Sequence, residues 1–468
     1  MATSPFPLSW ASLAVAAALA PALRAEPAAA PPPNIIFILA DDLGYGDLGC
    51  YGQREIQTPN IDRLAREGMR FTQFYAGAPV CAPSRTVLMT GKNTGHATIR
   101  GNAKVNLKPS DVTVAEVLQR GGYATGLSGK WGLGTEGSEG SPLHKGFDHF
   151  FGYVDQTMAH NYYPAFLVRD GRRVPLRNVV PHPGRYGQGV ATVRLDYAPD
   201  LIAADAYNFI ERNRDRPFFL YLSQILPHAN DERKPDGMEV PDYGPYARRD
   251  WPGPEKGYAA MVTRLDDEVG RVMAELKRLG LEDRTLVIFT SDNGPHHEGG
   301  YDPAFFHSAG RLRGLKRDVY EGGIREPMIA RWPGHIAAGS ETDQVGYFGD
   351  FLATAAELAR QETPPGLDSI SLVPTLLGHP AAQEQHRFLY WEFYEGESSQ
   401  AVRMGNWKAV RIPMLTGPIQ LYDLARDPGE THDVAAEHPG VVARARAVME
   451  REHVPDPAWK VGAAANPN

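Results

Sequence analysis

The sequence predicts an α/β protein with a large, mostly parallel sheet flanked by helices, followed by a smaller C-terminal α+β domain with a short antiparallel sheet. Over most of the chain, apolar runs of strand length are separated by helical patterns, as in parallel sheets. Near the C-terminus, short strand-like runs instead follow one another and end in one helix. The 468 residues are enough for two such units.

The composition is that of a globular protein. Hydrophobic residues make up 42% and charged residues 22% of the chain, which excludes disordered and fibrous classes. The 48 glycines and 39 prolines predict many shaped loops, where functional residues often lie. The formal net charge of −8 gives no basic field for nucleic acid or for an anionic membrane, so we expect neither as a partner. An anionic substrate would need a local cationic pocket.

The first 25 residues have the pattern of a signal peptide. The apolar segment 11–23 is too short to span a membrane and is followed by the small residue Ala25. The alternative is a disordered tail rich in alanine and proline. We expect cleavage near residue 25 and export to the periplasm or the extracellular space, with no membrane span later in the chain.

Four apolar runs predict the strands of the parallel sheet, and polar residues follow each of them. The runs and these residues are 34–40 with Asp41 and Asp42, 123–128 with Lys130, 217–222 with His228, and 285–290 with Asp292 and Asn293. Ligands of open α/β sheets bind beyond the carboxyl ends of the strands. We therefore expect these side chains to share one rim.

Three carboxylates and one amide on this rim indicate a metal site. Asp41, Asp42, Asp292 and Asn293 offer hard oxygen ligands, without cysteine or histidine partners at zinc spacing, so the implied ion is Ca²⁺ or Mg²⁺. Ca²⁺ is preferred because it tolerates many carboxylate oxygens in irregular geometry. Each residue alone could instead form a turn or a cap, but their common position after strands favours the site.

The segment that starts at Cys81 predicts a short helix, with Pro83 in its first turn and Gly91 at its end. Cys81 would lie at the helix N-terminus, where free N–H groups favour negative charge. Arg85, about one turn further on, could bind an oxyanion at the same point. We interpret Cys81 as a candidate nucleophile; the alternatives are a buried structural cysteine or a disulfide with Cys50.

The C-terminal part predicts a separate unit. A helix over 350–359 and a turn region over 374–377 precede it, so we expect a catalytic domain over 34–378 and a C-terminal subdomain over 379–460. The predicted strands are 387–393, 401–404, 407–412 and 421–422, and a helix follows over 438–452.

Three motifs resemble the formylglycine-dependent (type I) sulfatases of the alkaline phosphatase superfamily. They are Cys81-x-Pro-Ser-Arg85 followed by Thr-Gly, the segment Asn-Ile-Ile-Phe-Ile-Leu-Ala-Asp41-Asp42-Leu-Gly-Tyr-Gly-Asp, and Ser-Asp292-Asn293-Gly. The likeness continues through 58–65, 129–131, 227–228 and 316–325 to 421–428, and so covers nearly all of the chain after the leader. It implies an alkaline phosphatase-like fold and hydrolysis of a sulfate ester.

The resemblance also implies a nucleophile and its metal. A formylglycine-generating maturation enzyme would oxidise Cys81 to formylglycine (3-oxoalanine), and a hydroxyl of the hydrated aldehyde would attack the sulfur of the ester. Cys50 would then have no disulfide partner. The implied metal ligands are Asp41, Asp42, Asp292, Asn293 and the modified Cys81.

The other rim residues take roles from the same resemblance. Arg85 would orient the aldehyde hydrate. Lys130 and Lys316 would bind sulfate oxygens and neutralise developing charge. His228 would protonate the leaving alcohol.

One position departs from the family. After Lys-Trp many members have a histidine that assists the elimination step, whereas this chain has Gly132. The candidates to replace it are His160 and the pair His296 and His297, of which we favour His160 or His297. Otherwise elimination would be slow.

The substrate class is indicated by loops rich in glycine, proline and aromatic residues, which favour a sulfated carbohydrate. The alternative is that these aromatic residues only pack the loops. A likeness to sulfatases of N-acetylgalactosamine and to arylsulfatase A favours a galactose-type sugar. Two other functions stay open: a phosphonate or phosphodiester hydrolase of the same superfamily, and a sulfated-glycan-binding protein without turnover, suggested by the glycine at 132. The candidate substrate contacts are His160, Asn161, His296, His297 and Asp302.

Overall fold

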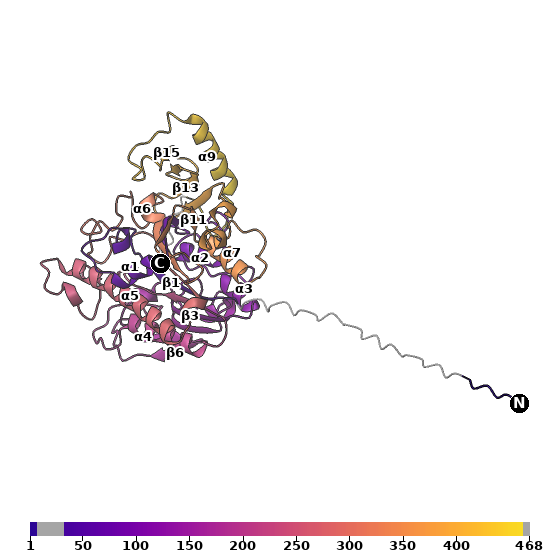
Figure 1. Cartoon of the computed structure of the whole chain (residues 1–468). Coiled ribbons are helices and arrows are strands. Elements are labelled where there is room, and N and C mark those ends of the chain that lie inside the picture. Colours follow the sequence, from indigo (N-terminus) through magenta and orange to yellow (C-terminus); the bar gives the residue numbers. More distant parts are fainter. Residues whose placement is uncertain (7–31, 462–468) are drawn as a thin grey trace. The chain divides into compact units, whose positions relative to one another are not determined.

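Eleven strands form one large sheet in residues 1–6 and 32–461, the part of the chain that the computed structural model describes (Figure 1). They are β1 (Asn34–Ala40), β2 (Met69–Tyr75), β3 (Ala124–Lys130), β4 (His149–Tyr153), β5 (Phe166–Arg169), β6 (Arg172–Pro175), β7 (Phe218–Ser223), β8 (Thr285–Ser291), β9 (Arg325–Arg331), β10 (Ser340–Thr342) and β11 (Gly346–Tyr347). The order is β10-β2-β9-β8-β1-β7-β3-β4-β5-β6, and β11 pairs with β2.

The centre of this sheet is parallel, as the sequence predicts. The block β8-β1-β7-β3-β4 pairs only in parallel, and β9 and β5 join its two sides in antiparallel orientation. The four predicted strands correspond to β1, β3, β7 and β8, and their ends lie within two residues of the predicted ones. The predicted α/β class is therefore confirmed.

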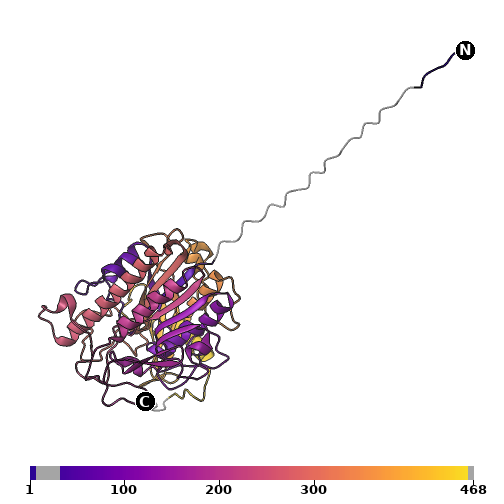
Figure 2. The same cartoon turned by 90° about the horizontal axis from the view of Figure 1, so that it is seen from below.

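Helices cover both faces of the sheet. Alternate residues of β1 contribute to two separate cores: Ile35 and Phe37 to one, Ile36 and Ile38 to the other. Residues of α2, α3 and α7 complete the first core, and residues of α1, α4 and α5 complete the second, whose helices run alongside the strands in Figure 2. The α-helices are α1 (Pro59–Arg66), α2 (Cys81–Thr90), α3 (Val114–Arg120), α4 (Ala198–Arg212), α5 (Gly253–Arg278), α6 (Glu321–Ile324), α7 (Asp350–Leu358), α8 (Val373–Leu376) and α9 (Pro439–Glu452).

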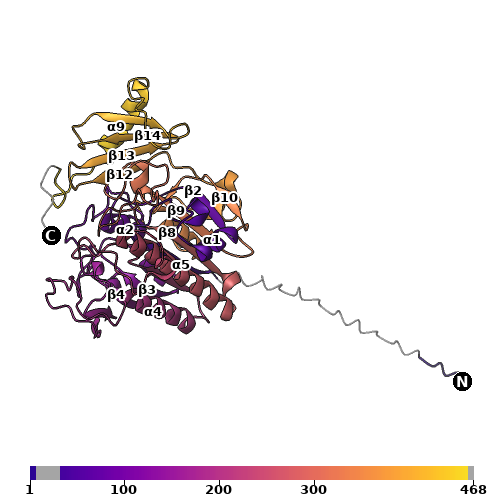
Figure 3. The same cartoon turned by 90° about the vertical axis from the view of Figure 1, so that its left-hand side faces the viewer.

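A second, antiparallel sheet lies in the C-terminal part, above the large sheet in Figure 3. It consists of β12 (Leu389–Phe393), β13 (Ser399–Met404), β14 (Trp407–Arg411) and β15 (Ile419–Asp423), in that order. Helix α9 packs against it through Val441, Ala445 and Met449. The four strands and the helix that the sequence predicts here are confirmed, with ends within two residues.

One of the two cores of the large sheet also includes residues of the small sheet. Trp391 of β12 is fully buried in the core that covers one face of the large sheet, and its Nε1 donates to the carbonyl oxygen of Ala76 at 2.9 Å. Buried Lys408 of β14 pairs with Glu321 at 3.0 Å. The small sheet is thus held by apolar packing and by a buried ion pair.

The predicted signal peptide lies outside the described residues, apart from its first six. In the described part of the chain, none of the helices combines the length and the hydropathy that a membrane span requires.

Candidate active site

The carboxylates after β1 and the residues after β8 meet at one edge of the sheet. The two strands are parallel neighbours with Ala40 opposite Ser291, so the residues that follow them come together. The Asp42 N–H donates to Asp292 Oδ1 at 3.1 Å, and Asn293 Nδ2 donates to Asp42 Oδ1 at 2.7 Å. These side chains are fully buried, as is Asp41.

The backbone at this edge adopts an unusual conformation. Asp42 has φ of 66°, in the left-handed region that residues with a Cβ rarely occupy. The next residue is held by a hydrogen bond from the Leu43 N–H to Ser291 Oγ at 2.9 Å. Residues held in such conformations cluster at functional sites, where the surrounding structure imposes them.

Helix α2 presents Cys81 to this cluster. The helix begins at Cys81, ends at Gly91 with φ of 69°, and every residue in it is buried. Cys81 Sγ lies 3.3 Å from Asp41 Oδ1 and 3.9 Å from Asp42 Oδ1. Asn102 accepts a hydrogen bond from the Ala82 N–H at 3.0 Å and so partly caps the helix N-terminus. The chain's two cysteines are both free, which excludes a disulfide with Cys50 in this structure.

Arg85 connects the helix to the strand ends. Its Nε donates to Asp292 Oδ2 at 2.9 Å, and its Nη1 donates to the carbonyl oxygen of Lys130 at 3.1 Å. Its Nη2 forms an ion pair with Asp292, 2.8 Å from Oδ2. Nη2 also lies 3.5 Å from Asp41 Oδ2. The guanidinium is fully buried, and its planar group lies between these two carboxylates and holds them in fixed positions.

Two lysines and a histidine complete the ring of charges. Lys130 Nζ donates to Asp41 Oδ2 at 2.6 Å. Lys316 Nζ donates to Asp42 Oδ2 at 2.8 Å and to Glu298 Oε2 at 2.8 Å, and it lies 3.1 Å from His228 Nε2. All three groups are almost completely buried.

The pKa values of these groups reflect burial and charge together. Burial alone would raise the pKa of Asp41, but Lys130 and Arg85 outweigh it and hold that pKa below its usual range. Burial, and then Asp41, raise the pKa of Asp292 to about 7. Burial, and then Lys316, lower the pKa of His228 to about 4.

The oxygen-rich cluster fits a hard divalent cation. Asn293 Oδ1 is buried and has no hydrogen-bond partner among the described residues. The other end of the amide, Nδ2, donates to Asp42. Ligand atoms of Asp41, Asp42, Cys81 and His228 all lie within 4.8 Å of one another. A bound cation would be coordinated by this amide oxygen and would reduce the repulsion between the neighbouring carboxylates.

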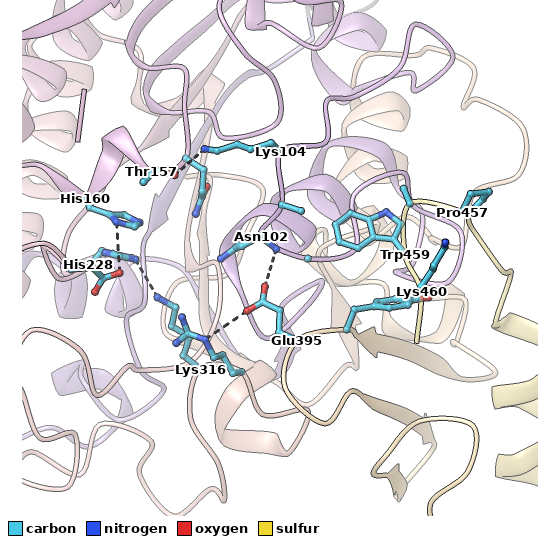
Figure 4. A pocket seen from close by; sticks show the side chains of 17 residues that line it. Asn102, Lys104, Thr157, His160, His228, Lys316, Glu395, Pro457, Trp459 and Lys460 are labelled. Atoms are coloured by element: carbon cyan, nitrogen blue, oxygen red, sulfur yellow. Dashed lines mark hydrogen bonds and ion pairs between the residues drawn. The ribbon is translucent and has the colours of Figure 1, made fainter. Parts of the chain in front are cut away.

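A cavity of about 460 Å³ opens beside this cluster. In Figure 4, His160, His228 and Lys316 line one side, Pro457, Trp459 and Lys460 line the other, and Asn102 and Glu395 lie between them. A volume of this size is typical of a site for a small organic ligand.

The five predicted substrate contacts lie in different surroundings. His160 lines the cavity, and its ring stacks on His228 at 4.8 Å. His296 is fully buried, and both of its ring nitrogens are occupied, by the Pro227 carbonyl oxygen at 3.2 Å and by the Glu298 N–H at 2.9 Å. The remaining three are not among the residues that line the cavity; one is fully buried and two are exposed: Asn161, His297 and Asp302.

Several residues of the site carry no signal that sequence reasoning could use. Glu298 bridges Lys316 at 2.8 Å and Arg317 at 2.6 Å, although it lies in a loop without periodicity. Gln156 and Trp459 line the cavity from segments more than 300 residues apart. Their proximity is a property of the fold.

Comparison with known proteins places this site in context. The model of the family described as Sulfatase matches residues 33–362, and that of the N-sulphoglucosamine sulphohydrolase C-terminal region matches residues 315–451. Human arylsulfatase A is 37% identical over 88% of this chain and 85% of its own length. Mouse N-acetylgalactosamine-6-sulfatase is 33% identical over 81% and 72%.

A solved structure extends the likeness to the whole fold. The crystal structure of Ps i-CgsB in complex with k-i-k-neocarrahexaose has a TM-score of 0.76 and 27% identity, over 92% of this chain and 94% of that one. With the fold and the site already described, these likenesses define a sulfuric ester hydrolase with the alkaline phosphatase-like fold. The chain belongs to the sulfatase family.

Proposed function

We propose that this sulfatase removes the sulfate group from a sulfated carbohydrate, with Cys81 converted to formylglycine and Ca²⁺, rather than Mg²⁺, as its metal. The observation that carries the proposal is the convergence of the strand ends on one helix N-terminus. Asp41 and Asp42 lie within 4 Å of Cys81 Sγ, and Lys130 and Lys316 contact these two carboxylates from either side.

Relatives and cavity size support a sugar as the group that carries the sulfate. One relative is named for N-acetylgalactosamine, and one structural neighbour was solved with a neocarrahexaose. The cavity of about 460 Å³ has room for a saccharide unit, and its lining mixes charged, polar and aromatic side chains such as Lys104 and Trp459.

The chain's own residues supply binding, orientation and a proton. A bound Ca²⁺, held by Asp41, Asp42, Asp292, Asn293 and the modified Cys81, would polarise a sulfate oxygen and the nucleophile. Lys130 and Lys316 bind the remaining sulfate oxygens, and Arg85 orients the modified Cys81 through its hold on the strand ends.

The proton for the leaving alcohol comes from the pair formed by His228 and Lys316. His228 Nδ1 lies 2.6 Å from the carbonyl oxygen of Ala229, which fixes the proton on Nδ1 in the neutral ring and turns Nε2 toward Lys316. A proton held between Nε2 and Nζ, 3.1 Å apart at the cavity wall, can pass to the alcohol oxygen as its bond to sulfur breaks.

The proposal also includes the route by which the protein matures. Residues 1–25 direct export to the periplasm or the extracellular space, and a formylglycine-generating enzyme acts on Cys81 of the unfolded chain. The catalytic domain spans residues 34–378, and the C-terminal subdomain spans residues 379–460.

The test is production of the protein with and without a formylglycine-generating enzyme. The peptide that contains Cys81 is then weighed, and a sulfur replaced by oxygen with loss of two hydrogens identifies the modification. Sulfate release is measured from sulfated galactosaccharides and compared with phosphate release from matched phosphate esters. We expect release of sulfate only, by the modified protein only, and none by Cys81→Ala. An unmodified thiol in a host that converts a known sulfatase would contradict the proposal.

A further inference from the structure

We infer that Gln156 is a substrate-binding residue whose side-chain amide hydrogen-bonds to the sulfated saccharide in the cavity, in space that Gly132 leaves free. The inference rests on the proposed function and adds a specific contact to it. Three observations support it: the direction in which position 132 faces, the group that fills the space beside it, and the lack of a hydrogen-bond partner, within the described residues, for the oxygen of that group.

The first observation is the direction in which position 132 faces. Just after β3, the N–H groups of Trp131 and Gly132 donate to the carbonyl oxygens of Tyr153 and Val154 at 2.9 Å and 3.1 Å. These bonds hold the chain after Lys130 beside the segment that leads from β4 to Gln156. Trp131 points into the core, where its Nε1 donates to a backbone carbonyl, whereas the Cβ position of Gly132 points toward Gln156.

The second observation is what fills that space. A Cβ atom built on Gly132 would lie 2.4 Å from Gln156 Oε1, closer than any real contact, and Gly132 has φ of +74°, which glycine adopts without strain. The glutamine amide therefore occupies the volume that a side chain at position 132 would need. Gln156 also lines the cavity together with His228 and Lys316.

The third observation concerns the amide oxygen of this side chain. Gln156 Oε1 is buried and, in the described part of the chain, has no hydrogen-bond partner. A buried amide oxygen without a hydrogen bond is destabilising, and a bound ligand would relieve this. A saccharide offers both hydroxyl donors and oxygen acceptors, so it can satisfy both ends of the amide.

The residues on both sides of Gln156 hold it in place. Asp155 Oδ1 accepts a hydrogen bond from the Thr157 N–H at 2.8 Å, and Lys104 Nζ donates to Asp155 Oδ2 and to Thr157 Oγ1, both at 2.9 Å. Because the turn is fixed at both neighbours, the backbone of Gln156 is held at the cavity wall before a ligand arrives. A backbone that is already ordered adds little entropy cost to binding.

The experiment compares variants that change the amide in different ways, first in turnover of the sulfated saccharide. Gln156→Met keeps the length of the side chain and removes its hydrogen bonds, and Gln156→Ala removes both. We expect kcat/KM to fall by about tenfold or more in each, equivalent to about 1.4 kcal/mol, with the pH profile unchanged because an amide does not titrate. Gln385→Ala, an exposed glutamine outside the cavity, is the matched control and should behave as wild type.

A double-mutant cycle tests the link to position 132. Gly132→Ala should displace the amide and lower kcat/KM to a similar extent, whereas adding Gly132→Ala to Gln156→Ala should cause little further loss. Melting temperatures of all variants separate this effect from unfolding. Wild-type kcat/KM in Gln156→Met, or fully additive losses in the cycle, would overturn the inference.

A binding measurement keeps the inference separate from the proposed chemistry. In the Cys81→Ala background, which has no nucleophile, titration calorimetry with the sulfated saccharide should give a Kd about tenfold weaker for Gln156→Met. If the modified wild type releases no sulfate but this difference in Kd is found, the proposed reaction fails and the contact stands. Equal Kd values for Cys81→Ala with and without Gln156→Met would refute the contact, whatever the turnover.

Discussion

At the scale of single residues, the functional positions that the sequence reveals are those that follow strands. Asp41 and Asp42 were predictable because a parallel sheet must bring the residues after β1 beside those after β8. Glu298 and Gln156 were not, because each lies in a loop whose path depends on contacts distant in sequence. The sequence also left open which residue compensates for the glycine at 132, since that answer depends on packing.

Arg85 offers a prediction about buried charge. Its removal in Arg85→Ala leaves Asp292 and Asp41 without their shared partner in a fully buried site, so we expect a loss of about 3–5 kcal/mol in the free energy of unfolding. Urea denaturation measures it. Arg177 forms a similar fork with Asp196 on the surface, and Arg177→Ala should leave stability unchanged. Equal effects of the two substitutions would contradict the assigned role of burial.

Metal removal tests the oxygen cluster. A chelator should lower both the melting temperature and the rate of sulfate release, because a ligand that binds only the folded state stabilises it by mass action, by about 2.7 kcal/mol at 100 times Kd. Ca²⁺ should restore both better than Mg²⁺. Asn293→Ala, which removes the orphaned amide oxygen, should need more Ca²⁺ for the same shift. A melting temperature that is the same with chelator and with Ca²⁺ would count against a metal at this site.

At the scale of elements, three of the four strands predicted for the large sheet are apolar over most of their length. Strands β1, β7 and β8 lie in the middle of the sheet with both faces covered, and their sequences are continuous apolar runs. Strand β9 was missed because it contains three charged residues and a proline, although all seven of its residues are buried. Its arginines are paired in the structure, Arg325 with Glu321 and Arg331 with Glu67, and such pairing is not visible in the sequence.

Helix α9 is joined to the loop after α2 by a histidine, which predicts a pH dependence. His96 Nδ1 lies 2.8 Å from Asp368, and its Nε2 lies 3.7 Å from Glu452 of α9. The hydrogen bond to Asp368 raises the pKa of His96 above its ordinary value, against the opposing effects of burial and of Arg100. Its contribution to stability is therefore complete below about pH 6.5 and is lost as the pH rises through the raised pKa.

The measurement is the difference in unfolding free energy between wild type and His96→Gln across pH. We expect the difference to shrink as the pH rises from 6 to 9. His432→Gln, a change at an exposed histidine, serves as the control and should give a flat difference. A difference for His96→Gln that grows with pH would show that the sign is wrong.

At the scale of the whole molecule, two sheets of different architecture are joined by one shared core. The core on one face of the large sheet includes Trp391 and Val410 of the small sheet, and the buried pair of Lys408 and Glu321 crosses between them. The segment that connects them is exposed over most of residues 378–387. Sequence patterns indicated both sheets, but they gave no information about this shared packing.

This arrangement predicts the result of limited proteolysis. Cleavage should occur first within 378–387, because a protease needs exposed backbone that can open locally. The two fragments should stay together in size-exclusion chromatography and separate only in denaturant, since the shared core does not depend on the connecting segment. Fragments that separate in native buffer would contradict a shared core.

The strand order also determines when, during synthesis of the chain, Cys81 becomes buried. Strand β1 needs β8 as a neighbour, and their paired residues Asn34 and Thr285 lie 251 positions apart. During synthesis at 5–20 residues per second, the roughly 210 residues from Cys81 to the end of β8 take about 10–40 s to appear. Throughout that interval the helix that bears Cys81 lacks the strand end that buries it, and afterwards its thiol is inaccessible. The topology thus leaves the proposed maturation enzyme a period of tens of seconds in which to reach this cysteine, which ends when β8 joins the sheet.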